Sequence, residues 1–197
     1  MNEPVSKSLI GAISAVTAIA CGYDHSLALK ADGTVVAWGS NFFGQLGDNS
    51  TTNRLVPVAV NVASGTSSLL GKTVVAIAGA DAFSIALCSD GTLAAWGFNE
   101  AGTVGDNTTT ERHVPVAVNT DVGISALAGK IVVAIEAGNG FCLAWCSDGT
   151  LAAWGASRTA SAGSRSARCS AERAPYRSSA ARPRREWSAL ASASASE

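Results

Sequence analysis

The sequence repeats itself with a fixed period. The decapeptide CSDGTLAAWG occupies residues 88–97 and 146–155, and a looser copy, KADGTVVAWG, occupies residues 30–39. Trp38, Trp96 and Trp154 are therefore each 58 residues apart. A period of this length is typical of repeat proteins, in which each unit buries apolar surface against its neighbours. Without gaps, the chain aligns into two full units, 16–60 and 74–118, and a shortened third, 132–155, joined by linkers 61–73 and 119–131.

Each unit is built of short apolar runs separated by turn residues. In the second unit the runs are VVAIA, FSIALCS, TLAAW and VPVAV, which have the length of strands rather than helices. An Asp-Gly pair between the second and third runs predicts a hairpin in which both turn residues have positive φ; the glycines are Gly33, Gly91 and Gly149. Pro115 lies near the start of the last run, where its missing N–H predicts an edge strand. The unit is therefore predicted to be a four-stranded sheet.

The composition of the runs favours stacked sheets. They are rich in Ala, Val and Leu with little alternation, as expected where both faces of a sheet are covered. One tryptophan per unit, Trp38, Trp96 or Trp154, offers a large apolar surface to a neighbouring unit. The predicted fold class is all-β, a partial β-propeller of two full four-stranded blades and part of a third. So short a stack leaves apolar faces and strand edges open, so we expect a fragment or a member of an oligomeric ring, with self-association through the open blade edges.

Four segments carry a family resemblance: GYDHSLAL, DGTVVAWG, NFFGQLGDNSTTNR and VPVAV. They resemble the repeat of the regulator of chromosome condensation family, and the likeness extends over residues 12–155. The resemblance implies blades of the kind that form seven-bladed propellers. The segments ALAGKIVVAI and CSDGTLAAWG further resemble long bacterial repeat proteins, which implies a secreted or surface-associated parent protein.

Residues 156–197 differ from the rest of the chain in composition. They contain 12 Ala, 11 Ser and 8 Arg, and such a segment cannot bury enough apolar surface to offset the entropy of ordering it. We predict a disordered tail, and because the change falls inside a repeat motif, directly after WGA, we interpret it as the product of a frameshift. The net charge of −1 divides into −6 for the first 155 residues and +5 for the tail. The tail has few stacking residues, Tyr176 and Trp187, and no binding module, which argues against nucleic-acid binding.

Two short motifs resemble ligand sites, and neither predicts one. GTSSLLGKT at 65–73 has five residues between its first Gly and its Gly-Lys pair, whereas a phosphate-binding loop has four. The segments GDNSTT and GDNTTT, which contain Asp48 and Asp106, hold oxygen ligands suited to calcium, but such Asp-Asn pairs more often cap a turn. The sequence therefore predicts no cofactor, no metal and no small-molecule substrate.

The cysteines and histidines are predicted to be structural. Cys142 and Cys146 lack the nearby ligands of a zinc site, so the cysteines are interpreted as buried free thiols, with a disulfide as the alternative in an exported protein. His25 aligns with Phe83 and Phe141, which indicates a packing role. No catalytic motif occurs and no catalytic residue is predicted, so we expect that the protein is not an enzyme.

The N-terminal segment allows two interpretations. Lys7, the apolar run SLIGAISAVTAIA and Cys21 resemble a short signal peptide with a lipidated cysteine. The residues VTAIACG also align with the strand VVAIAGA at Val74, and cleavage there would remove the first strand of the first unit. We favour the strand, and because no apolar stretch is long enough to span a membrane we expect a soluble chain.

The loops between the third and fourth runs offer the most distinctive surface residues. Their aromatic side chains are suited to anchor a protein partner, and we expect at least one in each loop to pack against the adjacent blade instead. The predicted contact residues are Asn41, Phe42, Phe43, Phe98, Asn99 and Glu100. The predicted function is a non-enzymatic protein-interaction or structural repeat module with an unidentified partner. The family resemblance implies two alternatives: guanine-nucleotide exchange on a small GTPase coupled to chromatin, and inhibition of a β-lactamase.

Overall fold

The computed structural model describes residues 15–155, and the regular structure in this range is entirely β. Residues 1–14 and the predicted tail, 156–197, lie outside the described residues. The strands of the first sheet are β1 (Val16–Cys21), β2 (His25–Lys30), β3 (Val35–Gly39) and β4 (Arg54–Ala59). Those of the second are β5 (Val74–Ala80), β6 (Phe83–Cys88), β7 (Leu93–Gly97) and β8 (Arg112–Ala117). Those of the third are β9 (Val132–Gly138), β10 (Phe141–Cys146) and β11 (Leu151–Gly155).

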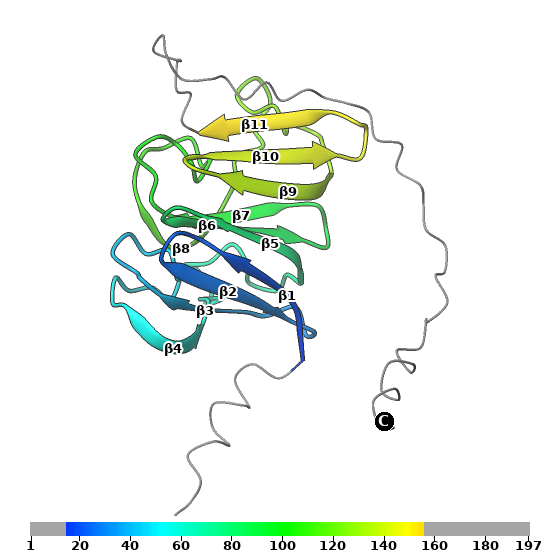
Figure 1. The fold of residues 1–197 in the computed structure, drawn as a ribbon. Helices are drawn as coiled ribbons and strands as arrows, with labels where there is room; N and C mark the ends of the chain where they lie inside the picture. The colour runs from blue at the N-terminus through cyan, green and yellow to red at the C-terminus, as the bar shows by residue number, and fades with distance from the viewer. Residues whose placement is uncertain (1–14, 156–197) are drawn as a thin grey trace, which may run out of the picture. The chain divides into compact units, whose positions relative to one another are not determined.

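Each sheet is an antiparallel meander in which every strand pairs with the next one along the chain. The strand orders are β1-β2-β3-β4, β5-β6-β7-β8 and β11-β10-β9. The three sheets stack one above another in chain order (Figure 1). The prediction of an all-β chain with two four-stranded sheets and part of a third is confirmed, and β8, which contains Pro115, is an edge strand as predicted.

The hairpin between the second and third strand is confirmed, but its turn differs from the prediction. In the first sheet the loop is Ala31-Asp32-Gly33, closed by hydrogen bonds from Lys30 N to Thr34 O and from Gly33 N to Lys30 O, both 2.9 Å. Only the glycine of the Asp-Gly pair has a positive φ, 80° at Gly33. This is a three-residue loop with a glycine bulge rather than a two-residue turn. Hydrogen bonds from the Thr34 hydroxyl and amide lower the pKa of Asp32 to about 2, so its carboxylate caps the turn.

The hydrophobic core lies between the sheets rather than within any one of them. One cluster of buried side chains joins the first sheet to the second, where Leu27 and Leu29 meet Trp96. The other joins the second sheet to the third, where Phe83 meets Cys142. The middle sheet therefore gives one face to the first sheet and the other face to the third. Burial of apolar area at these two interfaces is the main force that holds the stack together.

Burial differs sharply between the middle sheet and the third. Every residue of β6 and β7 is buried, because the middle sheet is covered on both faces. The third sheet is covered on one face only: Leu93 is 5% exposed but its counterpart Leu151 is 62% exposed, and Phe83 is 1% exposed but Phe141 is 41% exposed. Trp145 lies on the same open face. The expected open apolar face is therefore present, and self-association through it stays a prediction.

Two of the three predicted structural glycines lie at contacts between units. A Cβ at Gly33 would come within 2.6 Å of the Thr73 side chain, and a Cβ at Gly91 within 2.6 Å of the Ile131 side chain. Gly149, the third of the set, has no neighbour within 4 Å. The two turn glycines therefore permit the close approach of the following unit, in addition to the φ that their turns require.

The first strand and the cysteines can be compared with their predictions. Residues 16–21 form β1 and pair with β2, as the strand interpretation predicts. Cys88, Cys142 and Cys146 are buried free thiols as predicted, whereas Cys21 is exposed because it ends β1 at the turn into β2. Cys169 lies outside the described residues. In residues 15–155 the structure has no helix that is long and apolar enough to cross a membrane.

Candidate interaction surface at the loop end

One end of the sheets carries the short turns between first and second strands and the long loops between third and fourth strands. We call this the loop end; it comprises residues 22–24, 40–53, 81–82, 98–111 and 139–140. Within the first unit, Ser40 N donates to Asp24 O (2.8 Å), which joins the loop to the turn. Between units, Tyr23 N donates to Asp81 O (2.9 Å). The loop end, at the left edge of the stack in Figure 1, is therefore a continuous surface across the units.

A buried asparagine organises each long loop. The Nδ2 group of Asn41 donates to Asp48 Oδ1 (3.0 Å) and Ser50 O (3.0 Å), and its Oδ1 accepts from Leu46 N (2.9 Å). Asn99 makes the matching bonds in the second unit, and both side chains are 0% exposed. Buried polar groups with all their partners inside one loop fix its conformation. Asn41 and Asn99, which were predicted as contact residues, therefore shape the loops and are not accessible to a partner.

An arginine from the fourth strand closes each loop. Arg54 Nη2 lies 2.8 Å from Asp48 Oδ2, and Arg112 Nε lies 2.6 Å from Asp106 Oδ2. Partial burial acts to raise the pKa of Asp48, but hydrogen bonds from Ser50 and Arg54 outweigh it and hold the pKa below its usual value. Asp48 also accepts from Ser50 N (3.1 Å), so it caps its turn as predicted. Among residues 15–155, no group of three or more His, Cys, Asp or Glu side chains is arranged to hold a metal ion.

Each loop also receives the tryptophan of the following unit. Trp96 Nε1 donates to Gln45 O (2.9 Å), and Trp154 Nε1 donates to Thr103 O (3.1 Å). Gly47 lies directly against the Trp96 ring, since a Cβ there would come within 2.7 Å of Nε1. Its φ of 67° also favours glycine. The indole thus joins the loop of one unit to the sheet of the next.

A second polar link between units involves His25, which is buried as expected. Its Nε2 lies 2.9 Å from Ser84 Oγ, and the Ser84 hydroxyl donates to Gln45 O (2.8 Å). Because Ser84 directs its proton to Gln45, His25 donates through Nε2 and carries no proton on Nδ1. Nδ1 is buried and has no hydrogen-bond partner among the described residues. Burial lowers the pKa of His25 to about 4 against the opposing charge of Asp24, so the ring is neutral at pH 7.

Aromatic side chains gather at the loop end. Tyr23 is 83% exposed, Phe42 is 68% exposed and Phe43 is 37% exposed. The rings of Phe43 and Phe98 meet edge to face across the unit boundary, with centroids 5.1 Å apart. We call Tyr23, Phe42, Phe43 and Phe98 the aromatic patch. Phe43 and Phe98 support each other, as expected for one aromatic residue of each loop, while Tyr23 and Phe42 present their rings to solvent.

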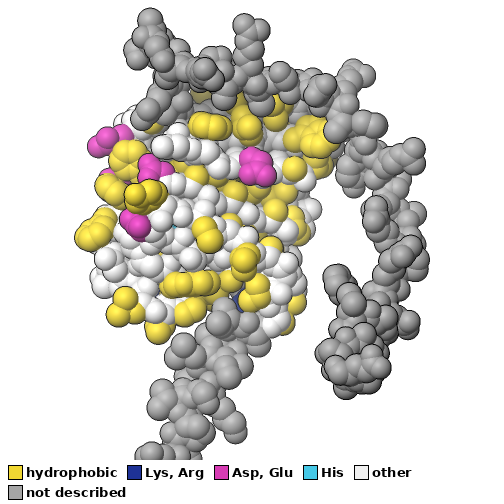
Figure 2. Space-filling view, viewed as in Figure 1, with side chains coloured by type: hydrophobic (Ala, Val, Ile, Leu, Met, Phe, Trp, Pro, Cys, Tyr) yellow, Lys and Arg dark blue, Asp and Glu magenta, His cyan; other side chains and the backbone are white. Residues whose placement is uncertain are grey.

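Unpaired acids accompany the aromatic patch. Every Lys and Arg side chain of residues 15–155 lies within a salt bridge to an aspartate; these are Lys30, Arg54, Lys72, Arg112 and Lys130. Asp24, Asp81 and Glu100 are exposed at the loop end and make no such salt bridge within that range. Figure 2 shows acidic side chains beside hydrophobic ones at its left edge, where the loop end lies. The surface is therefore both apolar and negatively charged.

The structure retains part of the predicted set and adds to it. Phe42, Phe43 and Glu100 are exposed at the loop end, and Phe98 is half-buried beside them. Sequence reasoning missed Tyr23 and the acids of the short turns. The signal that could have found them is the strand order, because in an antiparallel meander the first turn and the third-to-fourth loop share one end of the sheet.

These stacked antiparallel meanders, with a buried core between successive sheets, are blades of a β-propeller. The regulator of chromosome condensation (RCC1) repeat matches residues 32–87 and 90–145, and a second model of the same repeat matches residues 16–45. The chain belongs to the regulator of chromosome condensation (RCC1) repeat family.

Relatives of known sequence are much longer proteins. The chain is 34% identical over 135 residues to the human E3 ubiquitin-protein ligase HERC2, a match that covers 68% of this chain and 2% of that protein. It is 35% identical over 105 residues to the probable E3 ubiquitin-protein ligase HERC4 of Rattus norvegicus, covering 51% of this chain and 9% of that protein. The chain therefore spans only a small fraction of the length of these relatives.

Solved structures share the blade arrangement. Human WBSCR16 superposes with a TM-score of 0.62 and 27% sequence identity, covering 71% of this chain and 33% of that one. Prp20p of Saccharomyces cerevisiae superposes with a TM-score of 0.59 and 27% identity, covering 72% of this chain and 32% of that one. Prp20p is described with binding properties to Gsp1p and histones. The match therefore spans about a third of the length of each of these two structures.

Proposed function

We propose that this chain is a non-catalytic protein-interaction module and that it meets its partner through the loop end. The observation that carries the proposal is the aromatic patch with its unpaired acids. Tyr23 and Phe42 are large and exposed. Asn41 and its partners fix the loop that carries Phe42, and backbone hydrogen bonds to Asp24 O and Asp81 O hold the turn that carries Tyr23. Rigid aromatic side chains of this kind supply much of the binding energy at protein interfaces.

The relatives support an interaction role of this kind. Prp20p, which shares the fold, is described with binding to two protein partners, Gsp1p and histones. Propellers present variable loops on a rigid scaffold, so related chains can bind different proteins with the same architecture. The identity of the partner is therefore set by the loop residues of this chain rather than by its fold.

The charge of the loop end indicates the chemistry of the partner. Asp24, Asp81 and Glu100 are exposed beside the aromatic rings, and each Lys and Arg of residues 15–155 is already paired with an aspartate. A partner with Lys or Arg side chains around an apolar centre would complement this surface. Rim charges of this kind act mainly on the association rate, so binding is expected to weaken as salt is added.

The proposal predicts that Tyr23→Ser with Phe42→Ser abolishes partner binding. Both side chains are largely exposed, so their removal leaves the core intact. The immobilised full chain and its double variant are compared by quantitative mass spectrometry of the proteins they retain from an extract of the source organism. We expect the proteins enriched by the unmodified chain to fall by a factor of about ten or more with the variant, since loss of an aromatic anchor costs over about 1.4 kcal/mol.

A matched double variant controls for the loss of two apolar residues. Val62 and Val122 are exposed in the connections at the opposite end of the sheets, so Val62→Ser with Val122→Ser should retain the same proteins. Equal capture by the loop-end variant would rule the proposal out. Nucleotide release from a captured small GTPase, or inhibition of a β-lactamase, would favour one of the two alternatives that the family resemblance implies.

A further inference from the structure

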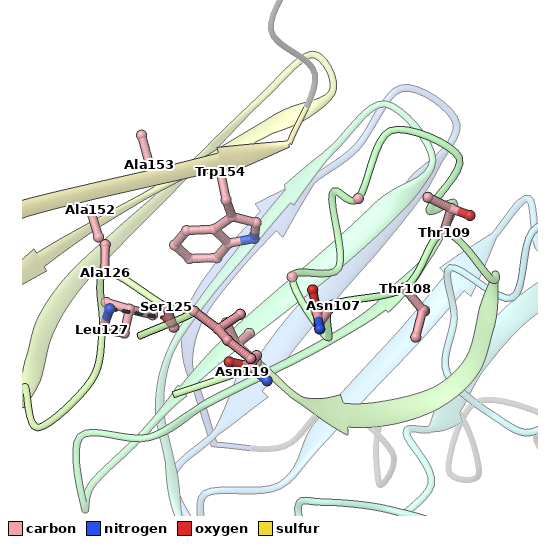
Figure 3. Close-up of a pocket in the computed structure, with 14 residues that line it drawn as sticks. Asn107, Thr108, Thr109, Asn119, Ser125, Ala126, Leu127, Ala152, Ala153 and Trp154 are labelled. Carbon is pink, nitrogen blue, oxygen red and sulfur yellow. Dashed lines mark hydrogen bonds between the residues drawn. The ribbon is translucent and has the colours of Figure 1, made fainter. Parts of the chain in front are cut away.

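A pocket of about 630 Å³ opens between the second and third sheets. Its walls include Trp154 and Ala152 of β11, Asn107 of the long loop and Ala126 of the connection to β9. Figure 3 shows the Trp154 indole between β11 and the loop, with Ala126 and Leu127 on one side and Asn107 and Thr108 on the other. The pocket belongs to neither the aromatic patch nor the acids around it.

The preceding interface shows what normally fills this position. There, β8 pairs with β7 through Ala95 and Val116. The unit before it also binds β8: Asn49 N donates to His113 O (3.0 Å), and Ser68 N donates to Pro115 O (2.9 Å). The Pro115 side chain is fully buried as a result. The fourth strand of one unit is therefore held on two sides, by its own sheet and by the backbone of the unit before it.

We call the backbone donors that hold β8 from the preceding unit the cradle. The corresponding donors recur one period later, where no strand of residues 15–155 lies against them. Asn107 and Ala126 lie 58 residues after Asn49 and Ser68 and line the pocket, and their amides donate to no backbone oxygen of residues 15–155. Along the described sheet, β11 is the edge strand.

The free space around Gly102 and the composition of residues 156–197 both support the comparison with the preceding interface. A Cβ at Gly44 would come within 2.5 Å of the His113 ring, whereas at its counterpart, Gly102, the nearest atom is 4.0 Å away. Residues 156–197 contain no valine and therefore no third VPVAV segment. In residues 15–155 the cradle is thus preformed and holds no fourth strand.

We propose that this cradle binds an extended segment of another polypeptide that carries a Val-Pro-Val core and pairs with the edge of β11. Addition of a peptide strand to an exposed sheet edge is an established mode of recognition, in which main-chain hydrogen bonds give affinity and side-chain pockets give specificity. By the example of β8, the proline carbonyl accepts from Ala126 N and the carbonyl two residues before it accepts from Asn107 N. Proline is compatible because the fourth strand is an edge.

The test uses the peptide TERHVPVAVN, which is residues 110–119 of this chain, with a fluorescent label. Titration with the full chain is followed by fluorescence anisotropy. We expect saturable binding, with slower hydrogen exchange at the amides of Asn107 and Ala126 in the complex. A peptide with Pro115→Asp should bind at least tenfold more weakly, because its carboxylate would take the place of a proline side chain that is fully buried at the preceding interface. No saturable binding, or equal binding of the two peptides, would overturn the proposal.

A variant of the protein locates the bound peptide. Ala126→Trp fills the pocket from an exposed position and should lower the affinity at least tenfold. Ala101→Trp, exposed at the loop end, should leave the affinity unchanged. Equal affinity of the two variants would contradict the assigned site. The comparison of the two peptides on the unmodified chain decides the proposal even if Ala126→Trp does not fold.

Discussion

Replacing Trp96 with alanine is expected to lower the free energy of unfolding by about 3–5 kcal/mol. Trp96 is 0% exposed and belongs to the cluster that joins the first sheet to the second. Its loss removes apolar contacts with both sheets, opens a cavity, and removes the hydrogen bond to Gln45 O in the loop of the preceding unit. The free energy is measured by urea denaturation followed by circular dichroism.

Two further variants divide this effect into its parts. Trp96→Phe keeps an aromatic ring but loses the N–H donor, and its cost should be about 1–2 kcal/mol, since Gln45 O still accepts from Ser84. Trp145→Ala removes a tryptophan from the open face of the third sheet, where it is 46% exposed, and should cost about 1 kcal/mol or less. A loss at Trp145 as large as at Trp96 would show that contact between successive sheets is not what stabilises the chain.

The stability of the chain should fall as the pH falls from 6.5 toward 4. Burial lowers the pKa of His25 from 6.5 to about 4, against the charge of Asp24, so the unfolded chain binds this proton more readily than the folded one. The neutral ring therefore contributes fully above pH 6.5, and its contribution is lost as the pH approaches 4. Integrated over this range, the loss amounts to about 3 kcal/mol. Urea denaturation at several pH values measures it.

The aligned units suggest a variant that tests whether His25 causes this dependence of stability on pH. The other two units have Phe83 and Phe141 where the first has His25, so His25→Phe places a residue that the fold already accepts. This variant should keep nearly constant stability between pH 6.5 and 5, where the unmodified chain loses about 2 kcal/mol. Below pH 5, aspartates with a lowered pKa, such as Asp32, begin to add their own loss. His113→Gln removes the exposed histidine and should leave the acid-dependent loss in place. An unchanged pH dependence in His25→Phe would assign the effect to other groups.

Local features of the fold follow from the sequence to a large extent. The 58-residue period, the strand-length apolar runs and the Asp-Gly pairs predict the sheets, their hairpins and the stacking through tryptophan. The predicted two-residue turn was wrong, because an Asp-Gly pair alone does not fix the length of the loop. The hydrogen bond from Lys30 N to Thr34 O closes a loop that includes Ala31 as a third residue. The period shows that the units contact each other, but it does not show which atoms meet.

Contacts between units are the part that could not be predicted. His25 is hydrogen-bonded to Ser84, 59 residues away, and the Ser84 hydroxyl donates in turn to the carbonyl of Gln45. Such a link depends on how one sheet is placed against the next, and a single sequence carries no direct signal for it. Asn41 and Asn99 are different, because they recur at the same place in successive units together with an Asp and an Arg at fixed spacing. That regularity indicates a structural network, and it could have separated them from the exposed aromatics.

Hydrogen exchange of the full chain tests most directly whether packing between successive blades, rather than within one blade, supplies the stability. The middle sheet is covered on both faces, so the amides of β6 and β7 should exchange most slowly, by a factor of about ten or more relative to those of the edge strands β4 and β11. The paired amides of all three sheets should still be protected, because each sheet shares a core with a neighbour. Exchange in β6 and β7 as fast as in β4 and β11, or an unprotected third sheet, would contradict the account.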